Sequence, residues 1–301
     1  MNRTKVVKDM IRLGMRFIPN HLLAYRLCAS QSIWFVHPPT GFRCEAGLAF
    51  GIPALWLSHE RECDARVILY LHGGGYVVGS TRTHLELACR IGRASQAQVM
   101  MLEYRLAPEN PYPAALEDAV LAYQYLLDNG VKAHNIIVAG DSAGGGLTLA
   151  TVMAIRDSGL PVPAGAVCLS PWLDLSCCFS SISHRIQRDP IITPERVRFF
   201  ARHYAAGQSL IDPGISPYFG DLRDLPPVLI QVGSDEILLN ECKYFCRRAK
   251  RIGVPVHLHV WPHMFHVWHF AARLLPQSRS AIRDIGQFVQ TQAPVHRRKA
   301  A

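Results

Sequence analysis

The segment NIIVAGDSAGGGL (residues 135–147) decides the fold of this chain. Its apolar first half predicts a buried strand, and the residues that follow predict a helix. Between the two, Ser142 lies between Gly140 and Gly144, the spacing of a sharp strand-to-helix turn that leaves no room for side chains there. Such a turn exposes the serine hydroxyl at a helix N-terminus. Ser142 is therefore the candidate nucleophile, and the alternative is a serine that only caps the helix.

On both sides of this segment, short apolar strands alternate with helices. The predicted strands cover residues 67–71, 98–104, 135–140, 164–170, 227–233 and 256–261. The predicted helices cover residues 84–95, 114–130, 144–159, 238–252 and about 267–291. This alternation is typical of an α/β fold, a mostly parallel sheet flanked by helices on both faces.

Two segments interrupt the alternation, residues 1 to about 40 and about 173 to 213. In open α/β sheets, ligands bind at the carboxyl ends of the strands. We expect both segments to form a helical cap there, over a single domain that spans residues 1–301.

Composition excludes several classes of protein. The 301 residues are 49% hydrophobic, which favours a large core. The net charge is +9, but the basic residues are scattered and form no stripe with aromatic residues, so a nucleic-acid partner is not expected. Nine cysteines, an odd number, favour a reducing compartment, and we expect the protein to be cytoplasmic.

The N-terminal segment MNRTKVVKDMIRLGMRFIPN (residues 1–20) predicts an amphipathic helix with a charge in every turn. We expect it to pack on the protein's own surface, and contact with a membrane surface is the alternative. The sequence has no run of 18 uncharged apolar residues, so stable membrane insertion is not expected.

A catalytic serine needs a histidine as base and a carboxylate to orient it, and in this kind of fold they follow in the order serine, acid, histidine. The strand end PVLIQVGSDEIL (227–238) offers Asp235, with Glu236 as the alternative acid. The later stretch VHLHVWPHMFHVWHF (256–270) offers His263 and His266 in a loop, and we favour His266. Its five histidines resemble a zinc site, but no carboxylate lies among them, so no metal is expected.

The glycine run of LHGGGYVVGS (71–80) suits the stabilisation of an oxyanion by backbone N–H groups. We expect Gly73, Gly74 and Ala143 to donate to it. The alternative is a phosphate-binding loop, but the Gly-Lys-Ser/Thr ending of such loops is absent.

Five segments in order carry a family resemblance: HGGGYVVGS, EYRLAPENPYPAALEDA, GDSAGGGL, GSDEILL and MFHVW. They resemble the hormone-sensitive-lipase-like branch of bacterial carboxylesterases, which have the α/β-hydrolase fold. The resemblance implies an eight-stranded sheet whose first strands pair antiparallel, a cap, frequent homodimers, and hydrolysis of a small-molecule ester without a cofactor. It assigns Ser142, Asp235 and His266 as the triad, and Gly73, Gly74 and Ala143 as the oxyanion hole.

These observations predict a serine carboxylesterase. Three aromatic residues, Tyr76, Trp172 and Tyr204, are expected to line the substrate pocket and to restrict it to short or medium acyl chains. The alternatives are a ligand receptor on the same fold that lacks catalysis, and a hydrolase of amides or lactones. Arg105 and Glu109 are expected to form a structural ion pair.

Overall fold

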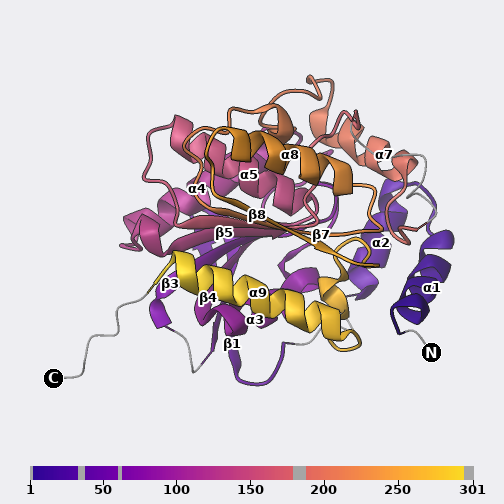
Figure 1. The fold of residues 1–301 in the computed structure, drawn as a ribbon, viewed down its shortest axis with the longest axis horizontal. Coiled ribbons are helices and arrows are strands. Elements are labelled where there is room, and N and C mark those ends of the chain that lie inside the picture. The colour runs from indigo at the N-terminus through magenta and orange to yellow at the C-terminus, as the bar shows by residue number, and fades with distance from the viewer. Residues whose placement is uncertain (1–2, 33–37, 60–62, 179–187, 295–301) are drawn as a thin grey trace.

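An eight-stranded sheet runs through the centre of the computed structural model (Figure 1). The structure describes residues 3–32, 38–59, 63–178 and 188–294. The strand order is β1-β2-β4-β3-β5-β6-β7-β8, and every pair from β4 to β8 is parallel. The strands are β1 (Phe42–Ala49), β2 (Ile52–His59), β3 (Cys63–Leu71), β4 (Ala97–Leu102), β5 (Ile136–Asp141), β6 (Gly165–Leu169), β7 (Val228–Gly233) and β8 (Val256–Trp261). The expected α/β-hydrolase fold is confirmed, with β1 and β2 antiparallel as the resemblance implied.

Alternating side chains of the central strands build two cores, one on each face of the sheet. In β3, Leu69 and Leu71 belong to one buried cluster, while Ile68 and Tyr70 belong to the other. This follows from the two-residue period of a strand, because successive side chains point to opposite faces. The central strands are apolar on both faces for that reason.

Helices cover both faces of the sheet (Figure 1). On one face lie α4, α5 and α8, and on the other lie α3 and α9, which pack against each other. Their bounds are α3 (Thr81–Ser95), α4 (Ala114–Asp128), α5 (Ala143–Asp157), α8 (Leu239–Arg251) and α9 (Pro276–Gln292). The predicted last helix, 267–291, begins too early: Trp268–Ala271 is a short 3₁₀ turn, and Pro276 takes the first helical position, where its missing N–H costs nothing.

Three further helices gather at one edge of the molecule (Figure 1): α1 (Arg3–Arg16), α2 (Leu22–Ser32) and α7 (Pro194–Ala205). The ring of Tyr25 lies 4.9 Å from that of Phe200, and the Arg196 guanidinium donates to the Met15 carbonyl at 2.7 Å. These contacts join the two segments that were expected to form a cap. The parts of that expected cap at 33–37 and 179–187 lie outside the described residues.

The expected ion pair between Arg105 and Glu109 is wrong, because each residue has another partner. Arg105 binds Asp118 and Glu117 of α4, whereas Glu109 binds Arg26 of α2. Glu109 therefore holds a helix of the expected cap against the loop after β4.

The contact between α3 and α9 depends on a glycine. A Cβ at Gly286 would collide with the Ala94 carbonyl oxygen, so the two helix backbones meet at this point. We expect Gly286→Ala to lower the free energy of unfolding by about 1–3 kcal/mol, as overpacking does. Gly14→Ala in α1 is the matched control, because nothing lies within 4 Å of its added Cβ. Urea unfolding of both variants checks this, and equal losses from the two would contradict it.

Candidate active site

Ser142 stands in a strained turn between β5 and α5. Its φ and ψ are 53° and −120°, an unfavourable conformation for a residue with a side chain. A Cβ at Gly140 would collide with the Gly144 carbonyl, and a Cβ at Gly144 would collide with the Leu71 carbonyl at the end of β3. Both glycines are therefore required by the close approach of three backbone segments, as the sequence predicted.

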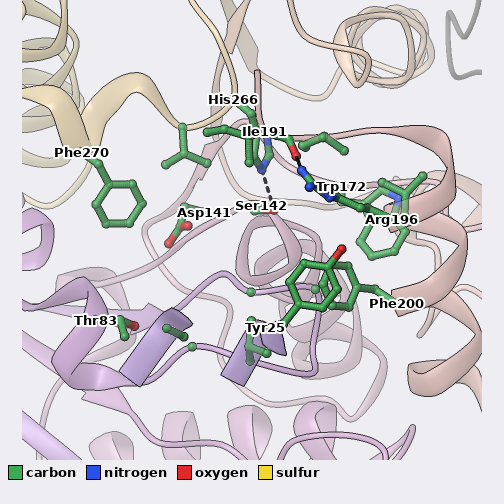
Figure 2. A pocket seen from close by; sticks show the side chains of 18 of the residues that line it. Tyr25, Thr83, Asp141, Ser142, Trp172, Ile191, Arg196, Phe200, His266 and Phe270 are labelled. Atoms are coloured by element: carbon green, nitrogen blue, oxygen red, sulfur yellow. Dashed lines mark hydrogen bonds between the residues drawn. The ribbon is translucent and has the colours of Figure 1, made fainter. Parts of the chain in front are cut away.

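His266 lies beside the serine. Its Nε2 is 2.8 Å from Ser142 Oγ, and Figure 2 shows the imidazole pointing at the hydroxyl. The histidine comes from the loop after β8 and is buried. His263, the other loop candidate, is exposed and borders a separate hollow beside Lys8 and Asp235.

The carboxylate at the other side of the imidazole belongs to Glu236 and not to Asp235. Glu236 Oε2 is 3.1 Å from His266 Nδ1, and its side chain is fully buried. Asp235 instead forms an ion pair with Lys8 of α1. The two acids are adjacent in sequence, and the turn after β7 directs them to different neighbours, so the choice of Asp235 as the orienting acid is corrected.

A small network fixes the Glu236 carboxylate. Its Oε1 accepts hydrogen bonds from Gly233 N–H at 2.6 Å and from Ser170 Oγ at 2.7 Å. Ser170 Oγ also accepts from Val267 N–H at 3.1 Å, directly after the histidine. Ser170 thus connects the acid to the histidine loop. Sequence analysis missed it, although its position at the end of a predicted strand was a usable signal.

The first glycine of the HGGG run does not face the site. Gly73 N–H donates to Asp141 Oδ1 at 3.1 Å and to His84 Nε2 at 3.2 Å, so it is already engaged. Gly74 and Gly75 line the pocket instead. Within the described part of the chain, no partner is found for the N–H groups of Gly74, Gly75 and Ala143. The structure therefore replaces Gly73 with Gly75 as a candidate oxyanion donor.

Asp141, between the glycine of the turn and the serine, holds the glycine loop in place. It is buried and accepts from Gly73 N–H and, at 2.7 Å, from Tyr70 Oη. Burial opposes its charge, but His84, 3.3 Å away, and the Tyr70 hydroxyl lower its pKa on balance. An ionised Asp141 therefore connects the end of β5 to the glycine loop, a role that sequence analysis did not assign.

A cavity of about 420 Å³ opens over Ser142 and His266 (Figure 2). Its walls are mainly apolar side chains from α1, α2 and α7 and from the loops at the strand ends. These are Met15, Tyr25, Ala29, Trp172, Ile191, Ile192, Val197, Phe200, Leu238, Val267 and Phe270.

Of the three aromatic residues expected in the pocket, the structure brings Trp172 there and leaves out the other two. Tyr76 and Tyr204 stack on each other, with ring centroids 3.7 Å apart, and both are buried. They join the loop after β3 to α7. Both side chains therefore belong to the core and do not line the pocket.

Neither metal ligands nor a disulfide marks the site. Among the described residues no cluster of three His, Cys, Asp or Glu side chains could hold a metal ion. The cysteines that the structure describes with their side chains are free thiols.

Comparisons with known proteins find similarity over the part of the chain that contains this site. A family model described as alpha/beta hydrolase fold matches residues 68–270, a range that contains Ser142, Glu236 and His266. The chain belongs to this family. An acetyl-hydrolase of Streptomyces hygroscopicus is 45% identical over 238 residues, which cover 79% of each chain.

Similar solved structures show to which branch of this hydrolase family the chain belongs. An esterase from the bacterial hormone-sensitive lipase family superposes with a TM-score of 0.94 at 40% identity, over 97% of this chain and 99% of that one. Esterase EstE5, soaked with p-nitrophenyl butyrate, gives a TM-score of 0.93 at 38% identity, over 98% and 100%. The expected family is confirmed, and the chain is a carboxylic ester hydrolase of the hormone-sensitive-lipase-like branch.

Two buried histidines near the hydrolase site predict how stability depends on pH. Burial lowers the pKa of His72 and of His269 to about 3. Each stays neutral in the folded protein and becomes protonated in the unfolded chain below about pH 6.5. Their contribution to the free energy of unfolding is complete above that pH and is lost as the pH falls.

His269→Gln tests this, because the amide can keep the hydrogen bond that His269 Nε2 makes with Gln231 Oε1. We expect the variant to lose stability less steeply than the parent between pH 6.5 and 4.5, by about 1.4 kcal/mol per pH unit. Urea unfolding at several pH values measures the slope. Identical slopes would show that His269 titrates normally in the folded protein.

Proposed function

We propose that this esterase acts through a covalent acyl-enzyme formed on Ser142, with His266 as the base and Glu236 as the orienting acid. One observation carries the proposal: an unbroken line of hydrogen-bonding groups from Glu236 to His266 to Ser142, ending at the cavity. The serine–histidine distance of 2.8 Å is within the reach that proton transfer requires.

In the first half of the reaction, Ser142 Oγ attacks the ester carbonyl while His266 Nε2 accepts the hydroxyl proton. Glu236 keeps Nδ1 protonated, so Nε2 presents its lone pair to the serine, and the carboxylate stabilises the imidazolium that forms. The tetrahedral intermediate then collapses to the acyl-enzyme. The departing alkoxide takes the proton from His266 and leaves as an alcohol.

In the second half, His266 removes a proton from water, and the resulting hydroxide attacks the acyl carbonyl. Collapse of the second tetrahedral intermediate releases the carboxylic acid and returns the proton to Ser142. Both intermediates carry negative charge on the former carbonyl oxygen. The N–H groups of Gly74, Gly75 and Ala143 are assigned to that oxygen, each worth about 3 kcal/mol in such sites.

The cap and the cavity define the substrate class. We assign α1, α2 and α7 to a cap that closes the acyl pocket, because Met15, Tyr25 and Phe200 from these helices line it. A mainly apolar cavity of about 420 Å³ suits a short or medium acyl chain. A receptor without catalysis is the weaker hypothesis, because receptor function would require no base at 2.8 Å from the serine.

Removal of the nucleophile tests the reaction directly. Ser142→Ala is expected to lower kcat for p-nitrophenyl acetate by a factor of about 10⁴ or more, since no acyl-enzyme can form. Steady-state kinetics measure this, with circular dichroism as the check on folding. A variant that keeps a tenth of the activity would refute the assignment.

The choice between the two adjacent acids is tested by isosteric amides. Glu236→Gln is expected to lower kcat by a factor of about 10³–10⁴, because the amide no longer stabilises the imidazolium. Asp235→Asn is the matched control and is expected to stay within about threefold of the parent, since Asp235 contacts Lys8. A large loss in Asp235→Asn with a small loss in Glu236→Gln would show that Asp235 is the orienting acid.

Replacing each of the two loop histidines, His266 and His263, tests independently which of them acts as the base. His266→Ala is expected to abolish turnover, and His263→Ala is expected to leave most of it, because His263 does not border the cavity. If only His263→Ala lost activity, His263 would be the base and not His266.

Acyl-chain preference follows from the cavity walls. We expect kcat/KM to rise from acetyl to butyryl or hexanoyl esters, by up to about 0.8 kcal/mol per buried methylene, and to collapse by palmitoyl esters. Phe200→Ala removes part of the wall and is expected to move the optimum to longer chains. An optimum at palmitoyl in the parent protein would contradict the pocket assignment.

A further inference from the structure

Residues 10–27 carry five large apolar side chains that remain exposed. In and just after α1 these are Met10, Leu13 and Phe17, with 66%, 61% and 76% of their surface exposed, and in α2 they are Leu23 and Leu27, with 62% and 61%. Steps of three and four residues place each set on one side of its helix. We call these five residues the N-terminal outer face.

The N-terminal outer face does not belong to the core. In α1, Thr4 and Val7 are buried, and Val7 packs into a cluster with Met264 and Trp268. Met10 and Leu13 of the same helix, and Phe17 just after it, are exposed. The helix therefore packs through one side, as the sequence predicted, and leaves other apolar side chains uncovered, which it did not predict.

The charges next to this face are almost all positive. Four basic side chains of α1, Arg3, Lys5, Arg12 and Arg16, are exposed, and the helix contains one acid, Asp9. Arg12 binds Asp9, but no ion pair is found for Arg3, Lys5 or Arg16 within the described part of the chain. The whole chain carries a net charge of +9, which adds attraction for a negative surface.

The same helices border the catalytic cavity. Met15 of α1 and Tyr25 and Ala29 of α2 line it, so the elements that carry the N-terminal outer face also form its wall. In Figure 1, α1 and α2 lie at the outer edge of the molecule, on the same side as α7. Whatever covers this face therefore comes close to the substrate cavity.

We propose that the N-terminal outer face docks on a lipid surface that carries anionic head groups. Apolar side chains flanked by Lys and Arg are the combination by which interfacial helices bind such a surface. A second copy of this chain fits less well, because a symmetric contact would bring the two sets of basic residues together. The helix lies on the surface: no helix in the described ranges is long and apolar enough to cross a membrane.

Docking would bring the cavity to the place where apolar esters concentrate. The proposal stands apart from the catalytic assignment, because it concerns α1 and α2 and needs no turnover. It is therefore tested in Ser142→Ala protein, which also keeps ester-containing lipids intact during the measurement.

The experiment is cosedimentation with vesicles of phosphatidylcholine and phosphatidylglycerol in equal parts, beside vesicles of phosphatidylcholine alone. We expect binding to the anionic vesicles at 50 mM NaCl and at least tenfold weaker binding to the neutral ones. The triple change Met10→Ser, Leu13→Ser and Phe17→Ser is expected to weaken binding at least tenfold. The double change Lys5→Glu and Arg16→Glu is expected to do the same.

A matched control replaces three apolar residues elsewhere that are also more than half exposed, Leu48→Ser, Ile211→Ser and Leu274→Ser, and should bind like the parent. In proteins that keep Ser142, turnover of p-nitrophenyl acetate should be unchanged by each set, which verifies folding.

Four results would overturn the proposal. They are no binding by the parent, equal binding to neutral vesicles, equal weakening by the control set, and a dimer in solution that the Met10, Leu13 and Phe17 changes dissociate.

Discussion

The close packing of three backbone segments at the end of β5 is the constraint on which the site depends. Gly140 and Gly144 let the turn at Ser142 press against the end of β3, where any Cβ would collide with a carbonyl oxygen. This packing holds Ser142 in its strained conformation and aims the N-terminus of α5 at the cavity. The glycine loop after β3 lies at the same place, since Asp141 binds Gly73 N–H across the gap.

Around this fixed point, buried hydrogen bonds hold Glu236 and the loop that carries His266. Ser170 joins the Glu236 carboxylate to the backbone that follows His266, so the loops after β6, β7 and β8 are fastened together. The N–H groups that we propose as oxyanion donors belong to the backbone, so they would need no reorganisation during the reaction. Helices α1, α2 and α7 contribute Met15, Tyr25 and Phe200 to the cavity wall. The stacked Tyr76 and Tyr204 lie in the core and join the loop after β3 to α7.

The sequence predicted the strands, the turn at Ser142 and the histidine that lies beside it, His266. The strands depend on local periodicity, and the turn depends on glycines with one steric use. It did not separate Asp235 from Glu236, because adjacent residues in a tight turn diverge according to backbone angles and to distant partners such as Lys8. It failed similarly at Gly73, whose N–H is taken by a residue 68 positions away. Tyr76 and Tyr204 were assigned to the pocket because bulk alone does not distinguish a wall from a core.

A crystal structure of the protein inhibited by diethyl p-nitrophenyl phosphate tests directly which groups bind the oxyanion and which acid orients His266. The inhibitor should phosphorylate Ser142 and leave a phosphoryl oxygen where the oxyanion forms. We expect this oxygen to lie about 2.7–3.1 Å from the backbone nitrogens of Gly74, Gly75 and Ala143. We also expect His266 Nδ1 to remain hydrogen-bonded to Glu236. An oxygen bound to Gly73 N–H, or an imidazole turned toward Asp235, would contradict it.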